Sequence, residues 1–155
     1  MGDHHLAEIN IGTLAHPLDH PAMAEFVALL DPINAMAEAS PGFVWRFTED
    51  GANDATGLRP FGPDVIVNFS VWESREALWD FTYRSDHLDL LRRRRDWFTH
   101  MRDTYLVLWW VPAGHRPDLA EAADRLALLR DRGPTPEAFT FATPFPPPRA
   151  ASAPA

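Results

Sequence analysis

The chain has 155 residues, enough for one domain with its own core, and 46% of them are hydrophobic. A formal net charge of -8 disfavours binding to nucleic acid or anionic lipid surfaces. The absence of cysteine excludes disulfides, thiol nucleophiles and thiolate metal sites. Because residues 1–5 are short and polar and no run of about 18 apolar residues occurs, we expect no signal peptide, no membrane span and a cytoplasmic location.

Hydrophobic periodicity predicts the elements of the first half of the chain. Residues 5–13 alternate between apolar and mixed positions and predict a strand. Residues 21–40 predict a helix that opens on a proline, and Pro32 is expected to kink it or divide it into two short helices. Residues 43–49 predict a second strand, which a long hairpin connection over residues 50–63 joins to the next one.

The second half contains the clearest local signal. Residues 64–87 predict a strand that runs directly into a helix with a serine at its cap, and residues 86–98 continue the helical pattern. Residues 104–111 predict a fourth strand that is apolar on both faces. Residues 118–133 predict a last helix, capped by an aspartate and closed by a glycine.

The order β-α-β-β-α-β, followed by a helix, predicts an α+β ferredoxin-like sandwich with both main helices on one sheet face. We expect one domain over residues 1–146, with a C-terminal helix and an extended segment, and a disordered Pro/Ala-rich tail over residues 147–155. The other sheet face would remain uncovered and more apolar than soluble monomers tolerate. We therefore expect a homodimer that forms through this sheet face.

Several long and collinear stretches resemble a known family: SPGFVWRFTED, VNFSVWESREALWDFTYRSDH, RRRRDWF, LVLWWVPAGHRPDLAEAADRLALL and GPTPEAFTF. Together they resemble domain of unknown function family 3291, within the dimeric α/β barrel superfamily, over roughly residues 5–146. The superfamily includes antibiotic-biosynthesis monooxygenases, which oxidise aromatic polyketides without metal or flavin, and haem-degrading monooxygenases. The resemblance implies a cavity between sheet and helices in each subunit of a dimer.

The resemblance also bears on the choice of cofactor. In the haem-degrading relatives an Asn on the first strand, a Trp ending the third and a His on the second helix surround the haem. Asn10 and Trp72 occupy matching places, but the ligand position falls near Arg92 and His87 lies a turn or more earlier. His87 instead resembles the Ser-x-His helix pattern of the monooxygenase relatives. We therefore predict no cofactor, and haem remains the alternative.

Strand parity points to a pocket independently of the resemblance. The less apolar parity of the strands holds a set of mainly polar side chains, namely Glu8, Asn10, Arg46, Thr48, Asn68, Ser70 and Trp72. A mostly apolar cavity with a few converging polar groups is typical of a ligand site. The alternative is a set of ordinary core hydrogen bonds among these side chains.

Four of these residues, together with one histidine, have predicted roles in a reaction. His87 is the candidate proton acceptor, because a histidine pKa is easily placed near neutrality, and its alternative is a surface position. Arg46 would polarise a carbonyl or enolate oxygen. Asn10, Asn68 and Trp72 would position the substrate.

Further side chains are candidates for contact with a flat aromatic substrate, namely Ser70, Tyr83, Trp79 and Trp109. Tryptophan is also common in cores and dimer interfaces, so these positions have a structural alternative.

Two clusters have weaker signals. His16 and His20 have the type and spacing of metal ligands, but no second cluster accompanies them, and we predict no metal site. The four arginines 92–95 point to several sides of a helix, so a solvated face or dimer salt bridges are expected rather than an anion site.

The sequence thus predicts a small-molecule enzyme of the antibiotic-biosynthesis-monooxygenase type, which acts on an apolar, aromatic substrate by cofactor-free oxidation or rearrangement. The first alternative is a haem-binding or haem-dependent enzyme. The second is a non-catalytic ligand-binding or assembly protein, in which the polar face is structural and the PFPPP segment contacts a partner. A sealed core without a cavity would favour the second alternative.

Overall fold

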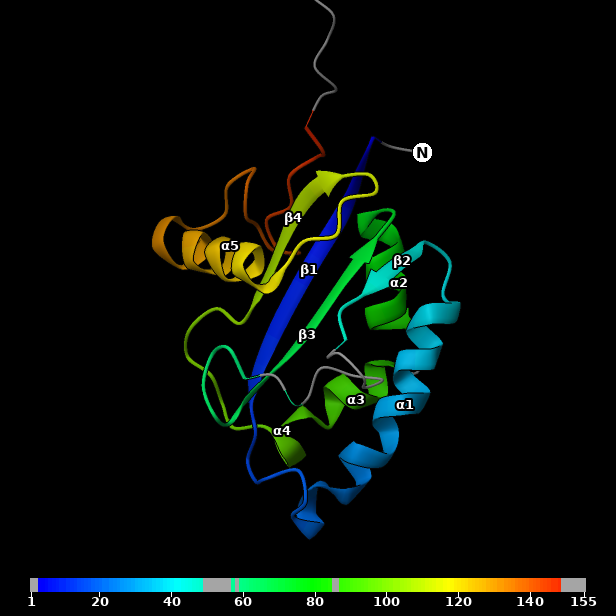
Figure 1. Cartoon of the computed structure of the whole chain (residues 1–155), viewed down its shortest axis with the longest axis vertical. Coiled ribbons are helices and arrows are strands. Elements are labelled where there is room, and N and C mark those ends of the chain that lie inside the picture. The colour runs from blue at the N-terminus through cyan, green and yellow to red at the C-terminus, as the bar shows by residue number, and fades with distance from the viewer. Residues whose placement is uncertain (1–2, 49–56, 58, 85–86, 149–155) are drawn as a thin grey trace, which may run out of the picture.

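The structure, a computed structural model, describes residues 3–48, 57, 59–84 and 87–148 (Figure 1). Its centre is a four-stranded antiparallel sheet in the order β2-β3-β1-β4. The strands are β1 (His4–Thr13), β2 (Phe43–Arg46), β3 (Val65–Trp72) and β4 (Leu106–Pro112). This is the strand order of a ferredoxin-like sandwich, which confirms the predicted fold class.

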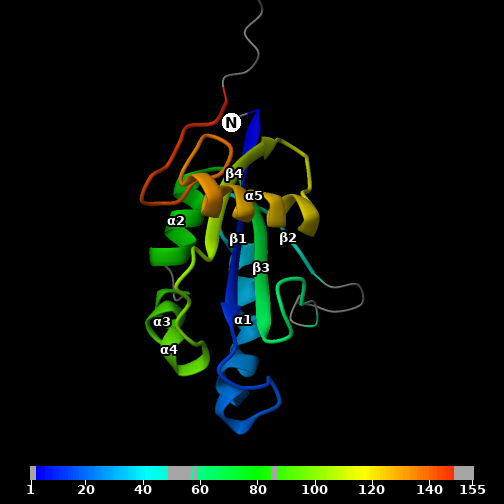
Figure 2. The ribbon, with the colours of Figure 1, turned by 90° about the vertical axis from the view of Figure 1, so that its left-hand side faces the viewer.

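Helices lie on both faces of the sheet. A 3₁₀ turn, η1 (Pro21–Met23), leads into α1 (Ala24–Ala39), and the other helices are α2 (Arg75–Arg84), α3 (His87–Arg92), α4 (Arg94–Trp97) and α5 (Leu119–Arg132). In Figure 2, α5 lies in front of the sheet and α1 lies behind it. Among the described helices, none combines the length and apolar composition needed to cross a bilayer.

The strand register decides which side chains share a face. Glu8 of β1 lies opposite Ser70 of β3, and Asn10 lies opposite Asn68. These residues are on the face toward α1 and α2. The other parity of β1, β3 and β4 forms the main apolar core with α5.

The sheet face that was expected to stay open is covered by α5. Three side chains of α5 are buried against it, namely Ala122, Leu126 and Leu129. The expectation of an uncovered face is therefore wrong, because the amphipathic α5 folds back onto the apolar parity of its own sheet. The predicted cap is confirmed, since the Asp118 side chain accepts a hydrogen bond of 2.8 Å from the backbone N–H of Glu121.

Other boundaries differ locally from the prediction. Pro32 lies inside α1, which continues past it, so the helix is not divided in two. A proline removes only one backbone donor, and the other hydrogen bonds of the helix can remain. The helical stretch expected over residues 86–98 is instead two short helices, α3 and α4. The serine cap of α2 is confirmed, since the Ala77 N–H donates to Ser74 Oγ at 3.1 Å. Half of the connection between β2 and β3, residues 49–56 and 58, is outside the described residues.

The segment after α5 packs against β4. Phe139 and Leu108 exchange two backbone hydrogen bonds of 2.9 Å, and Trp110 Nε1 donates to the carbonyl of Phe145 at 2.9 Å. Phe139 is fully buried. The segment up to Phe145 therefore packs against the sheet. The predicted boundary at residue 146 stays a prediction, and residues 149–155 of the predicted tail are outside the described part of the chain.

Candidate functional site

A cavity of about 250 Å³ lies between the sheet and helices α1, α2 and α4. Its apolar lining includes Phe26, Leu29, Leu30, Ile33, Leu78, Phe81, Trp97 and Phe98. Its polar lining includes Glu8, Asn10, Asn34, Arg46, Asn68, Ser70, Thr82, Tyr83, Arg94 and Tyr105. The cavity lies where the sequence predicted one and has the mostly apolar character of a small-molecule site.

Glu8 is at the centre of a hydrogen-bond network on the sheet side of the cavity. Asn10 Nδ2 donates to one carboxyl oxygen of Glu8, and Ser70 Oγ donates to the other at 3.2 Å. Trp72 Nε1 in turn donates to Ser70 Oγ at 2.9 Å. Two residues of this network belong to β1 and two belong to β3, so the pairing of these strands holds the four side chains on one face of the sheet.

The environment of Glu8 changes its acidity. Its side chain lines the cavity but is only 4% exposed. Burial raises the pKa of Glu8 from 4.5 to about 7, and the hydrogen bonds from Asn10 and Ser70 oppose the rise. A carboxyl group with a pKa near neutrality can accept or donate a proton at physiological pH.

Arg46 reaches the cavity from β2. Its side chain is 10% exposed, and Nη2 lies 3.7 Å from Oε1 of Glu38 on α1. A bulge between Phe43 and Trp45 places Arg46 opposite Ser70, on the cavity face. The predicted positions of Asn10, Asn68 and Ser70 on this face are likewise those of the structure.

The predicted aromatic residues separate into different environments. The Trp72 ring is stacked 5.2 Å from Phe81 beside the cavity. Trp79 is 40% exposed and lies 4.3 Å from the ring of Tyr83, which itself lines the cavity. Trp79 is not among the lining residues.

The structure does not bring Trp109 to the cavity. Trp109 lies on the opposite sheet face, fully buried under α5, and its Nε1 donates to Glu121 Oε2 at 2.8 Å. The reason is strand parity: β4 is apolar on both faces, and the position of Trp109 opposite Ala7 assigns it to the α5 side.

None of the histidines named from the sequence is among the described residues that line the cavity. His87 is the first residue of α3, but its side chain lies outside the described part of the chain. The rings of His16 and His20 stack 4.3 Å apart, and His20 Nδ1 accepts a hydrogen bond from the Ala22 N–H. In the part of the chain that the structure describes, no three His, Asp or Glu side chains converge to hold a metal ion.

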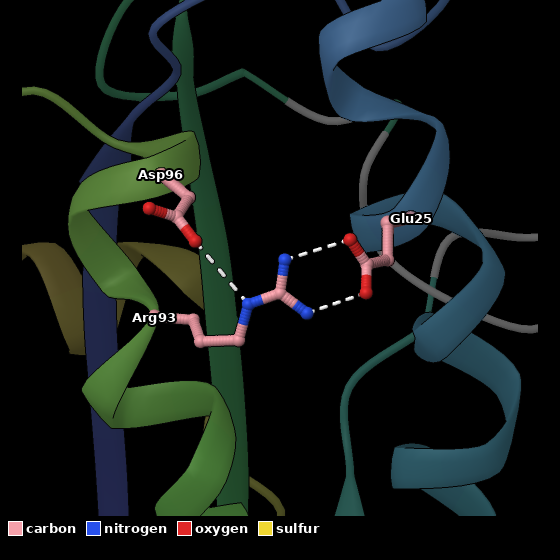
Figure 3. Close-up of polar contacts among 3 residues, drawn as sticks. All are labelled: Glu25, Arg93 and Asp96. Atoms are coloured by element: carbon pink, nitrogen blue, oxygen red, sulfur yellow. Dashed lines mark hydrogen bonds and ion pairs between the residues drawn. The ribbon is translucent and has the colours of Figure 1, made fainter.

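The arginine run is divided between ion pairs and the cavity. Arg93 forms a bidentate pair with Glu25 of α1 at 2.5 and 2.7 Å, and its Nε donates to Asp96 at 3.2 Å (Figure 3). This pairing lowers the pKa of Glu25 and joins α1 to the start of α4. Arg92 pairs with Asp89 at 3.8 Å, as expected for a solvated face. Arg94, by contrast, lines the cavity.

The sequence pattern did not predict the burial of Glu8 or the inward position of Arg94. Glu8 was placed on the correct strand face, but the depth of its burial depends on the helices above it. Arg94 is one of four consecutive arginines, and helical spacing alone does not predict which of them points toward the cavity. Both residues line the same cavity.

The described lining lacks the histidine that the haem alternative requires. Haem iron is held by histidine, cysteine, methionine or, in catalase, tyrosine, and of these types the described lining contains only Tyr83 and Tyr105. Arg92, which aligns with the ligand position, is exposed. Asn10 and Trp72, the residues that suggested haem, are engaged by Glu8 and Ser70 instead.

Comparison with solved structures finds similar chain paths. SnoaB, a cofactor-independent oxygenase from Streptomyces nogalater, is 18% identical with a TM-score of 0.47, over 74% of this chain and 96% of that chain. Rv0793 from Mycobacterium tuberculosis is 18% identical with a TM-score of 0.46, over 74% of this chain and 99% of that chain. A protein of unknown function from Nitrosomonas europaea is 16% identical with a TM-score of 0.47, over 75% of this chain and 95% of that chain. The fold itself rests on the strand order and register of this chain.

No curated protein matches the chain. A family model with the description "Domain of unknown function (DUF3291)" matches residues 5–154, which include the sheet except for its first residue, the cavity and α5. The predicted resemblance is thereby confirmed, and the chain belongs to the DUF3291 family.

Proposed function

We propose that this protein is a cofactor-free enzyme that removes a proton from a small aromatic substrate bound between the sheet and the helices. The observation that carries the proposal is the buried carboxyl group of Glu8, which lines the cavity with a pKa of about 7. A base of this strength suits the weakly acidic C–H or O–H groups of aromatic ketones and phenols.

The hydrogen bonds around Glu8 support its assignment as the base. Asn10 and Ser70 each donate to one carboxyl oxygen, so they hold the carboxyl group in a fixed orientation in either protonation state. Trp72 orients Ser70 in turn and contributes an aromatic surface beside Phe81. Arg46 lines the same cavity and supplies positive charge for an enolate oxygen that develops during proton removal.

Two reaction outcomes are consistent with this arrangement. An activated methylene that has lost a proton to Glu8 can rearrange, or it can react with dioxygen. In the oxidation, R₂CH₂ and O₂ yield R₂C=O and H₂O, so dioxygen is the oxidant: one of its oxygen atoms enters the carbonyl group and the other is released as water. His87 remains a second candidate for proton transfer, at the start of α3.

Oxidation of anthrone to anthraquinone tests the proposal, because anthrone combines an acidic methylene with a flat aromatic frame. We expect Glu8→Gln to lower the rate of anthraquinone formation and oxygen uptake by about a hundredfold or more, as loss of a general base does. The matched control is Glu76→Gln, which removes an exposed carboxylate from α2. A Glu8→Gln protein that oxidises anthrone as fast as the wild type would contradict the assignment.

The pH profile gives a second readout. Since the carboxylate form of Glu8 is the base, the wild-type rate should rise with pH through about 7 and then level off. A profile that is flat between pH 5 and 9 would contradict a role for Glu8 in proton removal.

The non-catalytic alternative, a ligand-binding or assembly protein, makes a different prediction about the core. A sealed core would have favoured it, whereas the structure has a cavity lined by ionisable groups.

The homodimer remains a prediction for the part of the sheet face beside Phe47 and Val65, which are partly buried next to the α5 core. Sedimentation equilibrium checks this prediction.

A further inference from the structure

Arg94 occupies the end of the cavity that is distant from Glu8 along β1. Its guanidinium lies 4.9 Å from the ring centre of Phe98 and 4.6 Å from that of Tyr105, so aromatic rings flank it. Its Nη2 donates to the carbonyl of Ile11 at 3.3 Å. These contacts fix the guanidinium in place while leaving further N–H donors for a ligand.

The neighbouring arginine shows what is unusual about Arg94. Arg93 is paired with two carboxylates, those of Glu25 and Asp96. Among the residues that the structure describes, no carboxylate forms an ion pair with Arg94. A half-buried cation that lines a largely apolar cavity without a carboxylate partner there favours an anionic ligand.

Arg94 and Phe98 both pack against Gly12 on β1. A Cβ atom added to Gly12 would lie 2.7 Å from the Phe98 ring and 3.4 Å from Arg94 Nη2. Glu8 lies four residues earlier on the same strand and face, roughly 13 Å away. Along the strand, this backbone separation is longer than two fused aromatic rings with one substituent.

We propose that Arg94 binds an anionic oxygen of the substrate, so that the ligand class is a small aromatic carboxylate or phenolate. The arginine would hold the anionic end of the ligand, and the opposite end would face Glu8. Only this second half rests on the proposed function, because recognition of the anion by Arg94 requires no reaction at Glu8.

The chemistry of the surrounding side chains suits such a ligand. Tyr105 and Tyr83 both line the cavity, and the pKa of Tyr83 is raised mainly by burial and further by electrostatic interaction with the nearby Tyr105. Their hydroxyl groups can donate further hydrogen bonds to a carboxylate or phenolate oxygen. The rings of Phe98 and Trp97 supply apolar contact for the aromatic frame.

A pair of matched probes tests the proposal by calorimetry or by quenching of tryptophan fluorescence. The probes are 2-naphthoate and 2-naphthamide, which share a shape but differ in charge. We expect the wild type to bind 2-naphthoate about tenfold more tightly than 2-naphthamide, which is the range of a hydrogen bond to a charged group. Equal affinities for the two probes, or no binding of 2-naphthoate at millimolar concentration, would overturn the proposal.

Variants then locate the preference. Arg94→Met should weaken 2-naphthoate binding about tenfold while leaving 2-naphthamide unchanged, and Arg94→Lys should restore part of the preference. Arg95→Met is the control, since it removes the same charge from an exposed neighbouring position. If Arg94→Met binds 2-naphthoate as the wild type does, Arg94 is not the anion site. The wild-type comparison of the two probes stands even if a variant folds poorly.

The two proposals fail separately. Binding of 2-naphthoate requires no proton transfer, so an inactive Glu8 would leave the preference for the anion intact. Conversely, loss of this preference in the wild type would leave Glu8 as a base for a neutral substrate.

Discussion

Replacing Glu8 by glutamine removes the ionisable group beneath the cavity with almost no change in size. Glutamine can still accept the hydrogen bond from Asn10 Nδ2 through its carbonyl oxygen. Its amide group can donate to Ser70 Oγ, because a serine hydroxyl both donates and accepts. The variant therefore isolates the charge of Glu8 from its packing.

The magnitude follows from the change in acidity on folding. Burial raises the pKa of Glu8 from 4.5 to about 7, so between these pH values the native state binds more protons than the unfolded chain. The wild-type free energy of unfolding should consequently fall as pH rises through this window, and the contribution of Glu8 is lost above pH 7. At about 1.36 kcal/mol per pKa unit, the total loss is about 3 kcal/mol.

Urea unfolding, followed by tryptophan fluorescence at pH 5 and at pH 8, measures this effect. The difference in free energy of unfolding between Glu8→Gln and the wild type should shift by about 2.5 kcal/mol, most of the total, in favour of the variant from pH 5 to pH 8. Other titrating groups cancel in this difference, and Glu76→Gln at an exposed position is the control. A difference that stays constant between pH 5 and 8 would refute the raised pKa and, with it, the basis of the proposed reaction.

Two further substitutions test the packing that shapes the site. Gly12→Ala places a Cβ atom 2.7 Å from the Phe98 ring, so we expect a loss of about 1–3 kcal/mol in urea unfolding and weaker binding of 2-naphthoate; wild-type stability would show that the ring moves freely. Leu126→Ala should cost about 3 kcal/mol in the same assay, because Leu126 is 1% exposed on the face of α5 that packs against the sheet, whereas a loss below about 1 kcal/mol would mean that α5 is loosely docked.

Much of the cavity floor could be predicted because the side chains of a strand alternate with a period of two. Once β1 and β3 were recognised, Asn10, Ser70 and Trp72 had to share a face, and the structure has them there. The same alternation does not show which side chains face the cavity where both faces of a strand are apolar. Trp109 could therefore not be assigned to a face before the register with β1 was known.

Features that depend on several elements were beyond the sequence pattern. The apolar stripe of α5 predicts that this helix is buried, but not against which surface. The bulge in β2 changes which residues reach the cavity, so Phe43 and Arg46 both line it although they are three positions apart. The acidity of Glu8 depends on the helices that exclude water above it, and no local pattern encodes that depth.

The charges of the cavity connect the two proposals. When Glu8 is protonated, the cavity presents the cations of Arg46 and Arg94 to a ligand, and anion binding is strongest. Ionisation of Glu8 prepares the base but adds a negative charge to the same cavity, which opposes an anion bound at Arg94. Binding of the substrate and readiness of the base therefore change in opposite directions as pH rises through the pKa of Glu8. A carboxyl group with a pKa near 7 balances the two requirements, whereas an ordinary glutamate would be ionised throughout and would weaken anion binding at every physiological pH.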